Sequence, residues 1–595
     1  MPRLWLSPLA IVVLTLLAQG CRPASSSPSA TDSTPVPPAS SAGRMEPPAA
    51  SPRTVRSAHR LAVDPDDHIR FRDATEATGI RFTHTSGNTP EKLYPTANGS
   101  GLAMLDYDGD GRLDLYFSTT RHLPIGTESP SKGNALYRNK GDGTFEDVTA
   151  RAGVGFDGFN QGVVAGDVDN NGHVDLYLTN LDGNVLYLNN GDGTFRRREN
   201  SGAECGLWSS GAAMLDYDND GKLDLYVTCY GSWPLKDAQP CGDAAKGVVT
   251  YCSPRTITPQ RHFLYHNEGN ATFVDATERA GILRADGRGL GVLAADLDDD
   301  GRIDLYVAND LCPHFLFFNN GDGTFTDATE SSGAALSESG QAQAGMGIDA
   351  EDTDGNGLPD LFVSHFEGDY GTLYRNLGGR GFQDVSASVG VVAGTAPYVG
   401  WGCSLGDLDN DGWPDLFVAN GHVDDNLAAM GRDVPWAEPA KVWRNRGDGR
   451  FRLAADPGPY FRESHVARGA AFGDLDNDGD LDAVISRMDA RPAVLLNETE
   501  VLGHWIRLDL TGTRSNRTSI GASAEVHVGT RVLRRQVKGG GSYLSSNDPR
   551  LLVGLGKSER VDKVVIRWPS GTLTTLDGPA IDRAHQVIEP SGSTP

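Results

Sequence analysis

Short apolar runs recur along the chain, and each follows directly after a polar loop rich in aspartate and glycine. The runs are three or four residues long and combine leucine with tyrosine, phenylalanine or valine, as in LYLT at residues 176–179. Apolar runs of this length, bounded by glycine and aspartate, are typical of β-strands. The pattern therefore predicts an all-β fold of many short strands. Comparable runs lie at residues 115–117, 225–228, 305–308, 361–364 and 416–419.

A second pattern, N-x-G-[DGN]-[GR]-x-F with small changes in length, follows the first at a regular interval. An apolar or aromatic pair precedes it, as in Leu136-Tyr137, and F-x-D often continues it. A strand, a tight glycine turn and a second strand are typical of a β-hairpin. We expect the aspartates in this pattern to form the turn rather than bind an ion. The copies are Asn139–Phe145, Asn190–Phe195, Asn267–Phe273, Asn320–Phe325, Asn376–Phe382 and Asn445–Phe451.

The polar loop before each apolar run has the form D-x-D-x-[DN]-G-x-x-D and occurs seven times. Oxygens at positions 1, 3 and 5 converge on one point only if the chain turns sharply after them, which the glycine at position 6 permits. Position 7 adds a backbone carbonyl and position 9 a carboxylate. The predicted metal ligands are Asp106, Asp108, Asp110 and Asp114; Asp167, Asp169, Asn171 and Asp175; Asp216, Asp218, Asp220 and Asp224; Asp296, Asp298, Asp300 and Asp304; Asp352, Asp354, Asn356 and Asp360; Asp407, Asp409, Asp411 and Asp415; and Asp474, Asp476, Asp478 and Asp482.

The donor chemistry of this loop favours Ca²⁺. All donors are oxygens in a flexible, carboxylate-rich set, which suits Ca²⁺ better than Mg²⁺ or Zn²⁺. The loop begins like an EF-hand, but an EF-hand needs a bidentate glutamate at position 12, where the first copy has Phe117. A single copy also resembles a β-turn of Asp, Asn and Gly. Seven copies with one spacing predict up to seven bound calcium ions.

The offset between the two patterns predicts a closed ring. An F-x-D strand occurs at Phe71–Asp73, before any aspartate loop, whereas the seventh loop is followed by Leu496-Asn497 and no such strand. The N-terminal strand can therefore complete the last sheet and remove both open edges. We predict a seven-bladed β-propeller over residues 65–500.

Length and charge agree with this reading. A chain of 595 residues exceeds what one ordinary core fills, so several domains or one large repeat architecture is expected. The formal net charge of -26 argues against nucleic-acid binding, because phosphate contacts need a basic surface. The predicted ligands explain this charge, since all but two of them are aspartates.

The N-terminus reads as an export signal. Residues 1–20 hold a basic residue, a short apolar run and small residues, and the run is too short for a confident membrane span. The segment Leu17–Cys21 resembles a bacterial lipobox, which would place a lipid on Cys21; ordinary cleavage near Ala18 is the alternative. Residues 21–55 form a Pro/Ser/Ala-rich tract that we expect to be a disordered tether. We therefore expect a protein of the bacterial cell envelope, an outer-membrane lipoprotein facing the periplasm or the surface, or else a secreted protein.

Six further cysteines form an even set for an oxidising compartment. Four of them lie in or around the insertion between the third and fourth loops. We predict a disulfide there, with Cys241 and Cys252 the best pair. Cys312 and Cys403 read as free thiols of the core.

Several motifs resemble those of FG-GAP/VCBS repeat propellers, such as the integrin α-subunit head, and specifically the cartilage acidic protein family with a C-terminal ASPIC/UnbV domain. They include Val418–His422, Gly539–Pro549 (GGGSYLSSNDP) and Trp568–Gly571 (WPSG). The resemblance covers residues 70 to 585, in the form of a bacterial lipoprotein. It implies calcium binding and an extracellular interaction role, with no established reaction.

Residues 502–588 read as a separate β-rich module, because four alternating apolar stretches recur within them. The segment Asn547–Pro549 reads as a turn. The module also carries basic residues that contrast with the acidic propeller. They would dock the module on the propeller, meet an acidic ligand, or only face solvent: Arg531, Arg534, Arg535 and Lys538.

Two functions from different classes fit the sequence. The first is a non-enzymatic calcium-binding interaction or adhesion module, held at a membrane by its lipid, whose partner is an extracellular protein or glycan. The second is a propeller enzyme acting on polysaccharide, a lyase or hydrolase, with His314, His365 and His422 as candidate bases. Each histidine lies in a repeat-associated segment, where packing or turn bonding is the simpler reading. The sequence contains none of the common nucleophile, phosphate-loop or zinc-protease motifs.

Overall fold

A computed structural model describes residues 68–127, 131–233, 240–500 and 503–592. The predicted signal peptide, the tether and Cys21 lie outside the described residues. Among the residues that the structure describes, no helix combines the length and the apolar character needed to cross a membrane.

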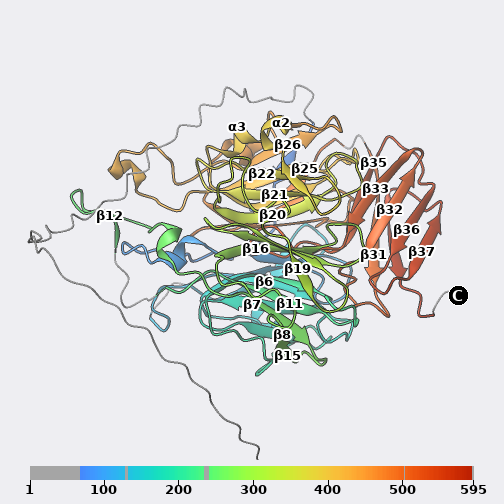
Figure 1. The fold of residues 1–595 in the computed structure, drawn as a ribbon, viewed down its shortest axis with the longest axis horizontal. Coiled ribbons are helices and arrows are strands. Elements are labelled where there is room, and N and C mark those ends of the chain that lie inside the picture. The colour runs from blue at the N-terminus through green and yellow to red at the C-terminus, as the bar shows by residue number, and fades with distance from the viewer. Residues whose placement is uncertain (1–67, 128–130, 234–239, 501–502, 593–595) are drawn as a thin grey trace, which may run out of the picture. The chain divides into compact units, whose positions relative to one another are not determined.

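Seven antiparallel sheets make up residues 71–497 (Figure 1). Six are built on four strands of a single repeat, and the seventh combines three strands of the last repeat with the N-terminal strand. The first four comprise β2 Leu102–Leu105, β3 Asp114–Phe117, β4 Ala135–Asn139 and β5 Phe145–Asp147; β6 Asn160–Gly166, β7 Asp175–Asn180, β8 Val185–Asn189 and β9 Phe195–Arg197; β10 Ser209–Leu215, β11 Asp224–Cys229, β14 Phe263–Asn267 and β15 Phe273–Asp275; and β16 Gly289–Ala295, β17 Asp304–Asn309, β18 Phe315–Asn319 and β19 Phe325–Asp327. The other three comprise β20 Gly345–Glu351, β21 Asp360–His365, β22 Thr372–Asn376 and β23 Phe382–Asp384; β24 Gly400–Gly406, β25 Asp415–Asn420, β26 Lys441–Asn445 and β27 Phe451–Leu453; and β28 Ala467–Gly473, β29 Asp482–Arg487, β30 Ala493–Asn497 and β1 Phe71–Asp73.

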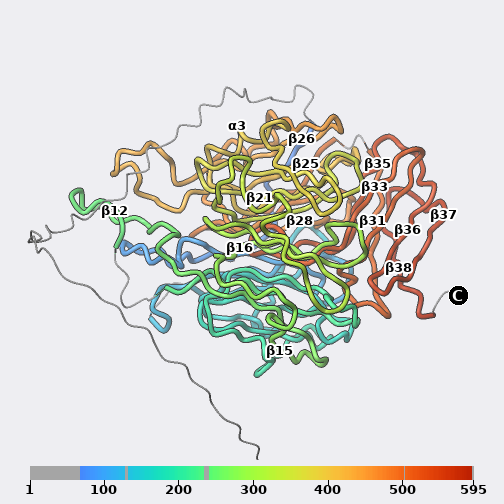
Figure 2. The backbone as a smooth tube through the Cα atoms, viewed as in Figure 1, coloured from blue at the N-terminus to red at the C-terminus, as the bar shows by residue number. Residues whose placement is uncertain are grey.

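Neighbouring sheets meet through their first strands. These contact one another in the cycle β2, β6, β10, β16, β20, β24, β28 and back to β2, so the sheets form a ring with the first strands innermost. Figure 2 traces the chain from sheet to sheet in colour order. Glycine allows the close approach: a Cβ on Gly347 would lie 2.1 Å from the carbonyl oxygen of Trp401 in the next sheet. The predicted all-β, propeller-like fold is confirmed.

The ring is closed by the N-terminal strand, as predicted. β1 pairs antiparallel with β30, with Phe71 opposite Asn497 and Asp73 opposite Leu495. Phe71 is buried and its ring packs against Phe417 and Phe461. β1 therefore covers the edge of β30 and gives the seventh sheet the same four-strand build as the others.

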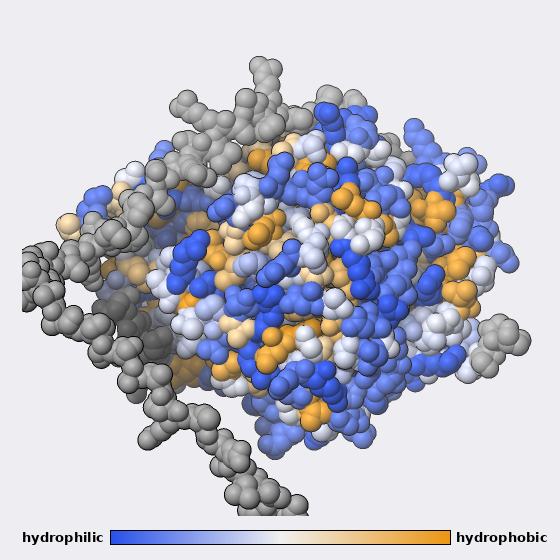
Figure 3. Space-filling view, viewed as in Figure 1, coloured by the Kyte–Doolittle hydropathy of each residue, from blue (hydrophilic) through white to orange (hydrophobic). Residues whose placement is uncertain are grey.

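Helices are few and short within the described part of the chain. They are α1 Thr149–Ala152, α2 Ser386–Val389 and α3 Val392–Thr395, with the 3-10 turns η1 Tyr94–Ala97, η2 Pro254–Thr256, η3 Leu427–Met430 and η4 Pro459–Arg462. On the face shown in Figure 3, most of the coloured surface residues are hydrophilic, with scattered apolar side chains among them.

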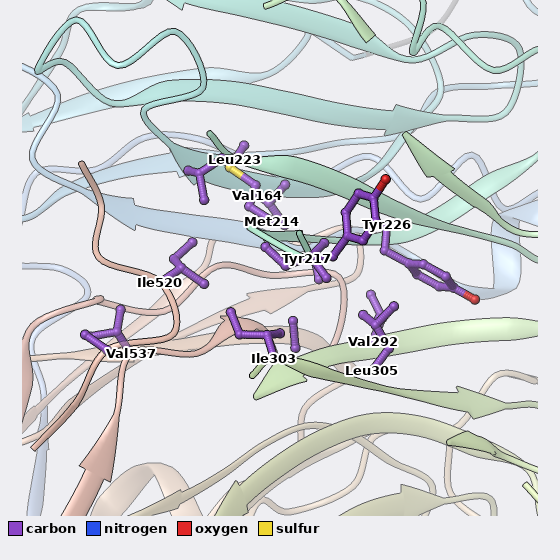
Figure 4. Packing of buried hydrophobic residues seen from close by; sticks show 14 of the residues in the cluster. Val164, Met214, Tyr217, Leu223, Tyr226, Val292, Ile303, Leu305, Ile520 and Val537 are labelled. Atoms are coloured by element: carbon purple, nitrogen blue, oxygen red, sulfur yellow. The ribbon is translucent and has the colours of Figure 1, made fainter. Parts of the chain in front are cut away.

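The C-terminal module contains two sheets. One has the order β35-β31-β38, in which β31 runs parallel to β38, and the other has the order β33-β32-β36-β37. Its apolar side chains join the core of the ring, as Figure 4 shows for Ile520 and Val537 beside Met214, Leu223 and Ile303. The strands are β31 His504–Thr511, β32 Ser523–Val528, β33 Arg531–Gln536, β35 Leu551–Gly556, β36 Lys563–Arg567, β37 Leu573–Asp577 and β38 Arg583–Ile588.

A segment of the C-terminal module, residues 539–548, lies inside the ring; we call it the plug. It begins as β34 (Gly539–Gly540), a fifth strand on the sheet of β16. Its backbone then bonds to several other innermost strands. In each of these bonds the N–H of the first residue donates to the carbonyl of the second: Gly541 to Val292 (2.8 Å), Ser542 to Ile348 (2.5 Å), Val163 to Leu544 (3.2 Å), Ser546 to Leu102 (2.9 Å) and Asp548 to Phe472 (3.0 Å).

The plug corrects one prediction. Asn547–Pro549 reads as a turn by composition, but Asn547 and Asp548 exchange hydrogen bonds with Phe472 of β28. The chain turns instead at Tyr543-Leu544, where Leu544 has φ +54°. The side chain of Tyr543 packs edge-on against Trp401, and its hydroxyl donates to the carbonyl of Asn98 (3.1 Å). Pairing partners inside the ring thus override the local turn preference.

The insertion between β11 and β14 carries a small hairpin, β12 (Cys241–Asp243) and β13 (Val248–Thr250). The predicted disulfide Cys241–Cys252 is present. Cys312 and Cys403 are buried free thiols, as expected, and Cys205 and Cys229 are also free, with their sulfurs 3.9 Å apart. In Figure 1, β12 and the red C-terminal strands lie on opposite sides of the sheets.

Candidate metal centres

Each aspartate loop joins the first and second strands of a sheet and folds around its own carboxylates. In the first loop, Asp106 accepts N–H bonds from Asp110 (3.0 Å) and Gly111 (2.8 Å). The equivalent pair of bonds recurs in the second to fifth loops. The glycine at position 6 has φ between +82° and +96° in all seven loops, so its predicted role in the turn is confirmed.

The aspartate at position 9 links each loop to its own hairpin. Asp114 begins β3, is fully buried, and accepts N–H bonds from Tyr107 in the loop (3.1 Å) and from Asn139 in the hairpin (2.7 Å). The same two bonds recur in the other six loops. Each carboxylate keeps lone pairs for a further partner.

In each of the first four loops the structure brings three of the four predicted ligands together. Carboxylate oxygens lie within 4.8 Å of one another in these sets: Asp106, Asp108 and Asp114; Asp167, Asp169 and Asp175; Asp216, Asp218 and Asp220; and Asp296, Asp298 and Asp300. In the sixth and seventh loops the closeness of the carboxylates is seen in their pKa values. Burial first, and then the charges of the other loop aspartates, raise the pKa values of Asp415 and Asp482 well above the usual range.

These sites have the features that a cation requires. One oxygen each of Asp108, Asp298 and Asp407 is buried and has no hydrogen-bond partner among the described residues. Burial is also the main reason that the pKa values of Asp114 and Asp175 rise to about 8. Several carboxylates gathered with unfilled lone pairs fit Ca²⁺, which takes six to eight oxygens in flexible geometry. A bound Ca²⁺ would be held by the side chains at positions 1, 3, 5 and 9.

Arginines beside the loops were not predicted from the sequence. In three sheets the residue before the hairpin asparagine is an arginine that faces the second aspartate of the loop. Arg375 Nε lies 2.8 Å from Asp354, and Arg444 Nε lies 2.5 Å from Asp409. Arg138 makes the equivalent contact in the first loop. The signal was present as Tyr-Arg-Asn and Trp-Arg-Asn, which we interpreted only as a strand before a turn.

The hairpin asparagines join neighbouring sheets in a closed cycle. The Nδ2–H of Asn189 donates to the carbonyl at position 2 of the first loop, that of Tyr107 (2.8 Å). Around the ring the same bond runs from each sheet to the loop of the sheet before it, and from the first sheet back to the seventh: Asn267 to Val168, Asn319 to Tyr217, Asn376 to Leu297, Asn445 to Thr353, Asn497 to Leu408 and Asn139 to Leu475. The loops therefore hold the ring together as well as gathering carboxylates.

Replacing Asn319 by alanine is expected to lower the free energy of unfolding by about 3 kcal/mol, because buried carbonyls of Tyr217 and Ile303 lose their donor. The side chain of the neighbouring Asn320 bonds only to the hydroxyls of Thr324 and Thr326 in its own hairpin, so Asn320→Ala serves as the control and should cost below about 0.5 kcal/mol. Urea unfolding of both variants in calcium measures the difference. Equal losses would contradict the role given to Asn319.

The C-terminal module covers the loop side of the ring. Its basic residues contact the loops and the strand ends beside them, so docking on the propeller is the confirmed alternative. In the seventh loop, Arg507 lies 2.7 Å from Asp474. The four predicted basic residues pair as follows: Arg531 with the carbonyl of Asp411 (3.2 Å), Arg534 with Asp299 (3.0 Å), Arg535 with Glu351 (3.8 Å), and Lys538 with Asp349 (2.6 Å) and Glu351 (2.9 Å).

The candidate catalytic histidines are buried. His314 and His365 stack with their Nε2 atoms 3.3 Å apart, and the remaining ring nitrogens contact the backbone of Asn309 and Tyr370. Burial lowers the pKa of His365 to about 3. The structure does not bring His422 into this pair; its Nε2 lies 3.7 Å from Glu367. These positions fit the packing reading of all three side chains.

Comparison with known proteins matches both parts of the chain to families. The FG-GAP-like repeat matches at residues 123–178, 167–227, 256–307, 296–363, 352–418 and 424–485, which together cover more than half of the chain. The ASPIC and UnbV family matches residues 512–594.

Curated relatives cover only part of the chain. Cartilage acidic protein 1 from Homo sapiens is 26% identical over 310 residues, which are 51% of this chain and 44% of that protein. Cartilage acidic protein 1 from Xenopus tropicalis is 26% identical over 295 residues, 48% of this chain and 42% of that protein. The matches thus span less than half the length of these relatives.

Two solved structures show weak similarity. One is an Agrocybe aegerita lectin described as recognising non-reducing terminal N-acetylglucosamine, with a TM-score of 0.37 and 16% identity, covering 67% of this chain and 94% of that one. The other is YCF48 bound to D1 peptide, with a TM-score of 0.38 and 7% identity; the match covers 74% of this chain and 99% of that one. Scores this low carry no functional argument.

The repeats, the ring that they build and the module that follows agree with the family matches. The chain belongs to the FG-GAP-like repeat proteins that carry a C-terminal ASPIC and UnbV domain.

Proposed function

We propose that this protein is a calcium-stabilised, non-enzymatic interaction module that works outside the cytoplasm, anchored to a membrane through a lipid on Cys21. The observation that carries the calcium part is the closed cycle of loop and asparagine contacts. Each loop gathers carboxylates and also binds the next sheet, so a cation in the loop would stabilise a junction between sheets. An interaction role agrees with the similarity to cartilage acidic protein 1.

The binding surface would lie on the side away from the aspartate loops. The loops and the third-to-fourth-strand hairpins lie at one end of the strands, and the C-terminal module covers that end. The second-to-third-strand connections lie at the other end, and they include the disulfide-bonded insertion of β12 and β13. Loops displayed by a rigid ring are a common binding surface. We expect an extracellular protein or glycan there.

Metal analysis of the purified protein tests the calcium part of this proposal. After equilibration in about 1 mM calcium, a concentration that fills extracellular-type sites, we expect close to one calcium ion per loop. Asp→Asn substitution at position 9 of one loop, such as Asp114→Asn, should remove one ion, whereas Asp142→Asn in the adjacent hairpin turn is the control and should remove none. A count below about four ions per chain would contradict the proposal.

A further inference from the structure

The third loop differs from the first, fifth and sixth in the side chain that faces its carboxylates. Where Arg138, Arg375 and Arg444 reach toward the second aspartate of their loops, the equivalent residue of the third sheet is His266. His266 lies on β14 directly before the hairpin asparagine Asn267. An imidazole offers a metal a nitrogen donor, which a guanidinium does not.

The His266 ring lies against the loop with its Nδ1 atom toward two carboxylates. Nδ1 is 3.4 Å from Asp218 Oδ2 and 3.3 Å from Asp224 Oδ1, and each of the three residues offers a ligand atom within 4.8 Å of the others. Nδ1 is buried and has no hydrogen-bond partner among the described residues. Tyr217 holds the ring in place by an edge-to-face contact at 5.9 Å.

These separations match a small tetrahedral ion. Zinc binds nitrogen and oxygen ligands at about 2.0–2.2 Å, and ligands at that radius in tetrahedral geometry stand about 3.3–3.5 Å apart. Calcium coordinates oxygen almost exclusively and at longer distances. Imidazole with carboxylates suits zinc and its first-row neighbours.

We propose that the third loop binds a first-row divalent transition ion, with Zn²⁺ the best fit, through Asp218, Asp224 and His266. Asp218 and Asp224 are also predicted calcium ligands, so the loop holds one ion at a time and the zinc ion replaces calcium there. Asp220 pairs with Lys222 and Asp216 accepts two N–H bonds of the loop, so one of these carboxylates or a water takes each remaining coordination position. The inference shares with the proposed function the premise that the loops bind cations, and it differs in the ion.

Zinc retention in the presence of calcium tests the inference. The full-length protein is first stripped of metal with a chelator and then equilibrated in about 1 mM calcium. A small excess of Zn²⁺ is added, free metal is removed, and the protein is analysed for both metals. We expect a single tightly held zinc ion in the wild type. His266→Arg, which installs the side chain found at the equivalent position of three other sheets, should lose it and keep its calcium-dependent melting temperature. Asp218→Asn should lose it as well.

A matched control uses another histidine–aspartate pair. His504, at the start of β31, lies 2.8 Å from the partly exposed Asp582, and His504→Arg should retain the zinc ion. Co²⁺ in place of Zn²⁺ gives a second readout, because its visible absorption should appear in the wild type and disappear in His266→Arg. Equal zinc in the wild type and His266→Arg, or complete displacement of zinc by calcium, overturns the inference and leaves His266 as a cationic partner like the arginines.

Counting both metals in the same samples separates the two proposals. Zinc retained by a protein that binds little calcium would support this inference and contradict the calcium proposal. Calcium bound without any zinc would do the reverse.

Discussion

Removing calcium from the purified protein is expected to lower its melting temperature by about 10 °C or more. A loop with a Kd near 10⁻⁴ M contributes about 1.4 kcal/mol at ~1 mM calcium, so all the loops together contribute about 10 kcal/mol. That equals the whole stability of many folded domains. Loss of the ions would leave several buried carboxylates facing one another at every junction between sheets.

Calorimetry or fluorescence-detected melting, with and without chelator, measures this effect. Added calcium should restore the melting temperature, and magnesium at the same concentration should not, because it demands smaller and more regular coordination. A melting temperature that stays within about 2 °C after chelation would contradict the structural role of the loops.

The pH dependence of the chelated protein has a definite sign. Burial raises the pKa values of Asp114, Asp175 and Asp216 to about 8 and that of Asp360 to about 7, all above their unfolded value near 3.8. Between the unfolded and the folded pKa, the folded state binds more protons than the unfolded state. These groups therefore stabilise the chelated protein at acidic pH, and this stabilisation is lost as the pH rises toward 8. Calcium acts in the opposite direction because protons compete with it. The stability gap between loaded and chelated protein should therefore be widest near pH 8.

Blocking the plug is expected to produce the second large effect. A Cβ on Gly101 would lie 1.7 Å from the carbonyl oxygen of Leu544, a contact with backbone that neither side can relieve by a rotamer change. Gly101→Val should therefore lower the free energy of unfolding by about 3 kcal/mol or more. It should also speed hydrogen exchange of the amides of Gly541, Ser542 and Ser546, which bond to the innermost strands.

A matched substitution controls for the change of residue type. A Cβ on Gly206 would meet nothing within 4 Å, so Gly206→Val should leave both stability and exchange of the plug nearly unchanged. If the two variants unfold at the same urea concentration, and the plug amides stay protected in both, the plug does not contribute to stability as described. Mass-spectrometric exchange on peptides that cover residues 539–548 gives the direct readout.

The features predicted correctly from the sequence are those set by neighbouring residues or by the phase of the repeat. The positive φ of Gly111 and its equivalents follows from the loop spacing, and the turn around Asp142 follows from its own threonine contacts. Ring closure by Phe71–Asp73 was predicted because this F-x-D strand precedes the first aspartate loop, whereas no such strand follows the last loop. The Cys241–Cys252 pair needed only the insertion to be recognised.

The features that sequence reasoning missed depend on contacts between distant segments. The plug was not predicted, because the glycines Gly539–Gly541 form strand hydrogen bonds only where the innermost strands supply the partners. The asparagines that bond to the preceding sheet were visible as part of the hairpin pattern. In two sheets, however, the bonding residue is Asn189 or Asn319, one position before the asparagine with which we began the pattern. His266 gave no signal alone, because its meaning depends on the arginines at equivalent positions.

The way in which β1 closes the ring has a consequence for the order of folding. Phe71 must find Asn497 across more than four hundred residues of chain, so the seventh sheet cannot form until nearly all of the repeats have been synthesised. Such distant pairing is intrinsically slow, and until it occurs β30 presents an unpaired edge. Early sheets can fold as they emerge, whereas ring closure and insertion of the plug must be late events. A chain interrupted before residue 493 would therefore remain an open, aggregation-prone ribbon, however many of its loops had formed.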